Sequence, residues 1–181
     1  MIKSDILLHC NDLNFRGPPC LLPIMPQANN ALAIWSKVTA LPFGWWLFSQ
    51  LVCFKAPYFG SISPRFVELR AGYCEVRLKK RRAVANHIGT VHAIAVCNLA
   101  EAAAGTMTEA TVPATHRWIP KGMTVEYLKK AGTDLRAVAK LEPIPEFGSA
   151  ADLPVPVSVT DVNGTEVFRA IITMHISPRR A

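Results

Sequence analysis

Four residues near the middle of the chain have side chains that acyl-transfer chemistry could use. Asn86, Gly89 and His92 form the pattern N-x-x-G-x-x-H, and Glu101 follows in the same segment. When a carbonyl becomes tetrahedral, negative charge develops on its oxygen, and the unpaired N–H groups at a helix N-terminus can stabilise that charge. A carboxylate can act as the general base that activates water. The pattern therefore predicts hydrolysis of an acyl group, with Glu101 as base and the backbone N–H of Ala93 as donor.

The element that carries these residues is predicted to be one long helix over about residues 92–110. Its only charged residue between Ala93 and Thr108 is Glu101, and its few polar residues are scattered, so the helix is expected to be buried nearly all round. Ala93 and Glu101 are separated by eight residues, roughly 12 Å along the axis, which is too far for both to act on one carbonyl. A functional site therefore implies a twofold dimer in which each helix N-terminus serves the partner's Glu101.

The rest of the chain changes to the period of two that is typical of strands. In residues 73–80 the apolar Cys74, Val76 and Leu78 alternate with charged residues. This alternation indicates a hairpin strand with one face exposed to solvent. Asn163-Gly164 is a strong hairpin signal, and the stretch 143–154 is expected to be a surface loop. The fold class is therefore α+β, a curved antiparallel sheet of about six strands wrapped around the central helix. The predicted strands are 66–70, 73–80, 122–130, 135–141, 155–162 and 166–176.

The N-terminal part divides into an arm and a capping region. Residues 1–28 contain scattered prolines and show no period, so they are expected to be an arm or leader outside the domain, with Met25 as an alternative start. A single domain is expected over 29–181. Residues 30–55 predict two short helices, broken at Pro42 and Gly44. These helices could close the core, cover an acyl chain or lie on a membrane surface.

Composition narrows the class of protein further. The chain has 181 residues, 50% hydrophobic and 18% charged, which suits one globular domain. A net charge of +7 points to a polyanionic partner: nucleic acid, anionic lipid or a phosphorylated small molecule. Five widely spaced cysteines without a CxxC pair indicate neither a disulfide framework nor a zinc ribbon, so a cytoplasmic location without a metal is expected. The longest uncharged stretch, 38–54, is interrupted by polar residues, proline and glycine and is too short to predict a membrane span.

The segment 82–105, RAVANHIGTVHAIAVCNLAEAAAG, resembles the hotdog-fold thioesterases of the PaaI and 4-hydroxybenzoyl-CoA thioesterase kind. The resemblance covers about residues 57–178 and is strongest to an uncharacterised bacterial branch with the pattern NHxGTxHAxA. It implies that Glu101 is the base or nucleophile, that Asn86 holds the attacking water or the substrate carbonyl, and that His92 precedes the catalytic helix. The family usually has Gly-Gly after this histidine, where this chain has Ala93-Ile94.

The resemblance also implies contacts to coenzyme A. The loop residues His87, Gly89 and Thr90 are candidate substrate contacts, and the basic run Lys79, Lys80, Arg81 and Arg82 is a candidate site for the phosphates of coenzyme A. The same run could also be a solvated strand end or a nucleic-acid site. It is short and lacks interleaved aromatic residues, which disfavours nucleic acid as a partner.

The function predicted from the sequence is hydrolysis or binding of acyl-CoA by a homodimer, with a homotetramer as the alternative. No cofactor is expected, because coenzyme A is part of the substrate. A non-catalytic acyl-CoA-binding or sensing protein is the alternative from another class. A hotdog dehydratase or hydratase is a further alternative, disfavoured because the HFP-type motif of the dehydratases is missing.

Overall fold

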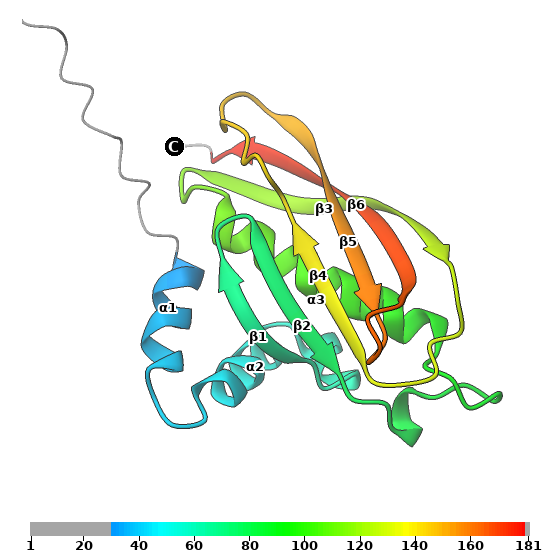
Figure 1. Ribbon diagram of the computed structural model, residues 1–181. Helices are drawn as coiled ribbons and strands as arrows, with labels where there is room; N and C mark the ends of the chain where they lie inside the picture. Colours follow the sequence, from blue (N-terminus) through cyan, green and yellow to red (C-terminus); the bar gives the residue numbers. More distant parts are fainter. Residues whose placement is uncertain (1–29, 180–181) are drawn as a thin grey trace, which may run out of the picture.

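Helix α3 (Ala93–Thr111) lies in the concave face of a curved sheet in the computed structural model, which describes residues 30–179 (Figure 1). The sheet has six strands in the order β1-β2-β4-β5-β6-β3, and all neighbouring strands are antiparallel. This is the hotdog arrangement that the sequence predicts. The strands are β1 (Arg65–Arg70), β2 (Tyr73–Leu78), β3 (His116–Tyr127), β4 (Leu135–Lys140), β5 (Ala151–Thr160) and β6 (Glu166–Pro178).

Small side chains allow the sheet to approach α3 closely. Ala102, Ala103 and Ala104 are fully buried, as are Leu99 and Met107 on the same helix. Since an alanine adds only a methyl group to the helix surface, neighbouring strands can pack near its backbone. The helix is buried over most of its length, as predicted, and its exposed large side chain is Ile94 in the first turn.

Helices α1 (Asn30–Thr39) and α2 (Gly44–Lys55) lie beside β1 and α3, and the short 3-10 helix η1 (Pro57–Ser61) connects them to β1 (Figure 1). Trp35 packs edge-on against Phe48, and Phe48 against Phe66 of β1, with ring centroids 4.8 and 5.6 Å apart. Ser49 Oγ also accepts the Phe66 N–H at 3.0 Å. The two predicted helices are present, and these contacts fix them to the core.

Prolines explain where strand boundaries differ from the sequence-based prediction. β3 begins at His116 rather than near Gly122, and it passes through Pro120, where its register with β6 shifts. Proline is tolerated there because β3 is an edge strand with a local irregularity. β5 likewise begins at Ala151, inside the predicted loop. Its Pro154 and Pro156 lie outside the segment that pairs with β4, so they have a strand on one side only.

The Asn163-Gly164 hairpin is confirmed, although its turn is longer than two residues. Strand β5 ends at Thr160, and β6 begins at Glu166. Asp161 Oδ1 accepts the N–H groups of Asn163 and Thr165, both at 2.9 Å, and closes the turn. Gly164 has φ of 79°, the left-handed region that favours glycine.

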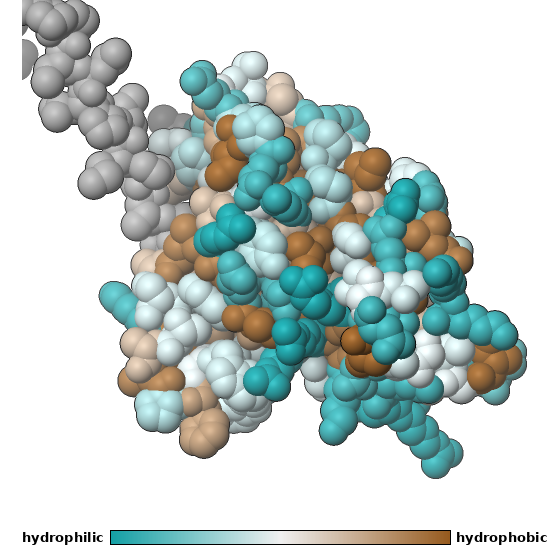
Figure 2. All heavy atoms as spheres, in the orientation of Figure 1, coloured by the Kyte–Doolittle hydropathy of each residue, from teal (hydrophilic) through white to brown (hydrophobic). Residues whose placement is uncertain are grey.

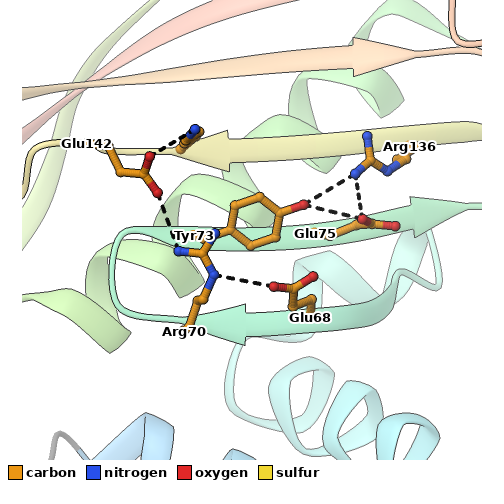
Figure 3. Close-up of polar contacts among 7 residues, drawn as sticks. Glu68, Arg70, Tyr73, Glu75, Arg136 and Glu142 are labelled. Carbon is orange, nitrogen blue, oxygen red and sulfur yellow. Dashed lines mark hydrogen bonds and ion pairs between the residues drawn. The ribbon is translucent and has the colours of Figure 1, made fainter.

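A cluster of charged side chains lies on the face of the sheet opposite α3, the face on which the charged residues of β2 were predicted to lie (Figure 3). Glu75 is only 5% exposed, and its carboxylate accepts hydrogen bonds from Arg136 at 2.7 Å and Arg77 at 3.0 Å. Tyr73 Oη lies between Glu75 and Arg136. Burial alone would raise the pKa of Glu75, but the hydrogen bonds from Arg136 and Arg77 outweigh it, so the pKa is lowered. The cluster is a paired, structural one.

Candidate functional site

The loop before α3 is shaped by Asn86. Its Oδ1 accepts the N–H groups of Ile88 at 3.1 Å and Thr90 at 3.0 Å, while its Nδ2 donates to Thr90 Oγ1 at 2.8 Å. Gly89 lies in the same turn with φ of 78°. These bonds occupy both ends of the Asn86 amide, so this side chain positions the loop, and the exposed residues at its tip are His87 and Ile88.

His92 caps the N-terminus of α3. The Nδ1 atom of His92 accepts the backbone N–H of Ile94 at 3.1 Å, and the backbone N–H of His92 donates to Val84 O at 2.8 Å. Because Nδ1 accepts, the neutral imidazole carries its proton on Nε2. The N–H groups of Ala93 and Ala95 have no hydrogen-bond partner within residues 30–179. The first turn therefore keeps two free donors at the positive end of the helix dipole.

A small cavity of about 190 Å³ lies beside this first turn. Asn98, one turn further along α3, lines it and is 5% exposed. Its Nδ2 donates to Ser61 Oγ at 3.3 Å and to Tyr58 O at 3.5 Å. Its buried Oδ1 has no hydrogen-bond partner in the part of the chain that the structure describes. The other lining residues are Ile62, Ala83, Val84, Ala85, His92, Ile94 and Ala95.

A larger cavity of about 400 Å³ follows the same face of α3 toward its C-terminal end. Glu101 lies in its wall, three residues after Asn98, and its side chain makes no hydrogen bond or ion pair within residues 30–179. Trp118 of β3 donates through Nε1 to Glu109 at 2.6 Å, and Gly105 lets the indole approach α3. The remaining wall is mostly apolar and comes from α1, α2, the segment with η1, α3 and the strands: Ala31, Ile34, Phe48, Leu51, Val52, Lys55, Ala56, Phe59, Thr106, Pro120 and Met174.

The two cavities are arranged along one side of one helix. Asn98, Glu101, Gly105 and Glu109 are spaced by three, four and four residues, which places them on one helix face. A polar cavity at the helix N-terminus is thus followed by an unpaired carboxylate and then by an apolar cavity.

Basic residues gather at the end of the molecule where α3 begins. The loop after β2 is joined to the segment before β4, because Lys80 N donates to Asp134 Oδ1 and Lys80 Nζ to Gly132 O, both at 2.8 Å. This brings the two basic segments, 79–82 and 129–130, to one end of the fold. Figure 2 shows strongly hydrophilic side chains extending at the lower right, where Figure 1 places the loop after β2.

The four residues of the first basic run differ in what they contact. Lys80 is held as described, and Arg81 donates to Ser61 O at 3.1 Å and Ser63 Oγ at 3.0 Å. Lys79 and Arg82 are exposed, and their side chains have no hydrogen bond or ion pair among the described residues. The run therefore combines structural contacts with free cations.

Cys97 has a structural contact. Its Sγ lies 3.1 Å from Tyr127 Oη of β3. The hydrogen bond with Cys97, together with partial burial, raises the pKa of Tyr127 to about 12. The phenol is thus protonated at neutral pH. Among residues 30–179, no group of His, Cys, Asp and Glu is arranged to hold a metal ion, and no helix is long and apolar enough to cross a bilayer.

Sequence comparison places the chain in a family. A family described as a domain of unknown function (DUF4442) matches residues 44–176, most of the chain. The chain belongs to the DUF4442 family. Among the curated proteins, none is similar at a significant level. A structural-genomics crystal structure is 52% identical to this DUF4442 protein, with a TM-score of 0.73, and the match covers 82% of this chain and 98% of the other.

More distant solved structures agree in fold. A Pseudomonas aeruginosa protein described as a probable thioesterase is 24% identical, with a TM-score of 0.68 over 77% of this chain and 97% of its own. A thioesterase family protein from Silicibacter pomeroyi is 16% identical, with a TM-score of 0.61 over 72% of this chain and 96% of its own. The DUF4442 chain therefore has the hotdog fold of thioesterase-family proteins.

The structure adds residues to the site that sequence patterns did not single out. Asn98 was part of the scattered polar set on α3, and its place beside Tyr58 and Ser61 depends on contacts 37 to 40 residues apart. Trp118 and Lys55 reach the larger cavity from β3 and α2. The one available signal for Asn98 was its position three residues before Glu101 on a helix without a solvent face.

Proposed function

We propose that the protein hydrolyses acyl-CoA thioesters at a site shared between two subunits. The observation that carries the proposal is Glu101, a carboxylate on a largely buried helix, in the wall of an apolar cavity of about 400 Å³, without a partner among residues 30–179. Glu101 is half-buried, and unlike the buried Glu75 it has no arginine partner in the described part of the chain. An unpaired carboxylate beside an apolar cavity is available to take a proton from water.

The N-terminus of α3 supplies the second part of the proposed chemistry. The free N–H group of Ala93 would stabilise the negative charge that develops on the thioester oxygen. His92 contributes by capping Ile94 N–H and fixing the first turn. The exposed Ile94 side chain stands where the thioesterases that the sequence resembles usually have glycine, so it would limit which substrates reach this donor.

A dimer would unite the two parts. Glu101 lies roughly 12 Å along α3 from Ala93, so the carboxylate of one subunit needs the helix N-terminus of another. Strand β3 is one of the two edge strands of the sheet and is twelve residues long, against six for β1. A long edge strand offers unpaired N–H and C=O groups to a second copy, which supports pairing through β3.

The rest of the substrate fits the remaining features. The larger cavity would hold an apolar acyl group next to Glu101. The exposed cations Lys79 and Arg82, with Lys129 and Lys130, would attract the phosphates of coenzyme A at the end where α3 begins. No bound cofactor enters the proposal.

The test measures the hydrolysis of a series of acyl-CoA thioesters, from acetyl-CoA to palmitoyl-CoA and including aromatic acyl groups, through the appearance of free thiol. Sedimentation of the same protein gives its oligomeric state. We expect turnover that is greater for longer or aromatic acyl groups than for acetyl, and a dimer or tetramer at micromolar concentration. Absence of turnover across the series, or a pure monomer, would contradict the proposal.

A non-catalytic acyl-CoA-binding protein is the second candidate. It is favoured by one observation: the Asn86 amide, which the family resemblance assigns to the attacking water or the carbonyl, makes its three hydrogen bonds inside its own loop, and two of them are to Oδ1. Calorimetric binding of acyl-CoA without thiol release would identify this function.

A further inference from the structure

The feature that the proposed chemistry leaves unexplained is the amide oxygen of Asn98. The side chain is 5% exposed, and Oδ1 is buried without a partner in the described part of the chain. The orientation of the amide is determined by Tyr58 O, which can only accept, so Nδ2 must face it and Ser61 Oγ. Because a buried carbonyl oxygen without a donor is destabilising, a hydrogen-bond donor is expected to complete this site.

The cavity beside Asn98 offers groups of both kinds. Oδ1 is an acceptor, and the free N–H of Ala95, which lines the same cavity of about 190 Å³, is a donor. No cationic or anionic side chain lines this cavity among the residues described, apart from the histidine cap His92. The cavity is small and offers one acceptor, Asn98 Oδ1, and one donor, the Ala95 N–H. A secondary amide matches this pair, because its N–H can donate to the acceptor and its C=O can accept from the donor.

We infer that this cavity binds a secondary amide of the substrate's pantetheine arm, with Asn98 Oδ1 accepting the amide N–H. The inference rests on the proposed function, since it concerns the thiol side of the same thioester. In coenzyme A the nearest amide is two methylene groups from the sulfur. Asn98 lies five residues after Ala93, about 7.5 Å along the axis, a separation that these methylene groups and the flanking hydrogen bonds can span. Asn98 is thus a specificity residue for the pantetheine arm.

The test compares two small substrates that differ at one atom. The first is an acyl thioester of N-acetylcysteamine, and the second is its counterpart in which an ester oxygen replaces the amide N–H. The wild-type protein is expected to use the second with a kcat/KM about tenfold lower, mostly through KM, because Oδ1 loses its donor and faces an oxygen. Asn98→Leu, which removes the acceptor, should bring the two substrates within about twofold of each other.

Two further variants separate recognition from folding. Thr108→Val alters a buried polar residue of the same helix whose hydroxyl donates to Ala104 O, so this variant should keep the preference for the amide. Ser61→Ala removes one partner of Asn98 Nδ2 and should reduce the preference without removing the acceptor. If Asn98→Leu does not fold, Ser61→Ala still reports on the positioning of the amide.

The outcomes distinguish this inference from the proposed function. Equal kcat/KM for amide and ester in the wild-type protein overturns the inference, while acyl-CoA hydrolysis stands. If no thioester is hydrolysed, the proposed function fails, and the two compounds are then titrated calorimetrically as uncleavable S-alkyl thioethers. An amide preference that is lost in Asn98→Leu still supports the inference, and equal affinities overturn it.

Discussion

Glu101 is the residue on which the proposed reaction depends most. Glu101→Gln keeps the shape of the side chain and removes the base, so thioester turnover is expected to fall at least about 10²-fold, the usual range for loss of a general base. Thermal unfolding should change little, because Glu101 has no partner among the described residues. Glu146→Gln, in the exposed loop before β5, is the matched control. Unchanged turnover in a folded Glu101→Gln protein would exclude Glu101 as the base.

Glu75 shows the opposite behaviour of a carboxylate, one used for stability. Its pKa is lowered in the folded protein by hydrogen bonds from Arg136 and Arg77, which outweigh burial. A lowered folded pKa stabilises the protein above the unfolded pKa, and this contribution is lost as pH falls through the folded value. Glu75→Gln should therefore cost about 1–2 kcal/mol at pH 7. Urea unfolding of both proteins should show that this difference shrinks below about pH 4.5. A difference in the free energy of unfolding that does not change with pH would contradict this stabilising role of the Glu75 carboxylate.

At the scale of elements, the corner between α1 and α2 controls the wall of the larger cavity. A Cβ at Gly44 would lie 2.0 Å from Val38 O and 2.7 Å from Thr39 Cα, both backbone atoms that cannot move independently. Gly44→Ala is thus expected to open the corner, to lower the free energy of unfolding by about 1–3 kcal/mol and to raise KM for long acyl chains. Gly148→Ala, which meets no atom within 4 Å, is the control. Equal stability of the two variants would show that the corner adapts.

At the scale of the whole molecule, charge at one end should determine how coenzyme A is held. Lys79, Arg82, Lys129 and Lys130 have no side-chain bond within residues 30–179, so replacing them with glutamine tests charge without removing structural contacts. KM for acyl-CoA is expected to rise about tenfold at low salt, with little change in kcat, because contacts remote from the carbonyl contribute uniform binding. An N-acetylcysteamine thioester, which lacks phosphates, should be unaffected. An unchanged KM for acyl-CoA would place the phosphates elsewhere.

The sequence by itself determined most of the fold. Alternation in β2 and the absence of a solvent face on α3 required a sheet around a buried helix, since the spacing of apolar residues is a local property of the chain. The same patterns misplaced the starts of β3 and β5. Proline usually ends a strand, and Pro120, Pro154 and Pro156 are allowed only because their strands lack a neighbour on one side there. That condition depends on the order of strands in the sheet.

The candidate site divides in the same way. Glu101 and the helix N-terminus were predicted from the sequence, because both lie within one helical segment with recognisable spacing. The unpaired Oδ1 of Asn98 and the apolar cavity were decided only by the tertiary structure. Each depends on where distant groups lie: Tyr58 and Ser61 for Asn98, and α1, α2 and Trp118 for the cavity. Hydrogen bonding and enclosure are properties of the packed chain, and no local pattern encodes them.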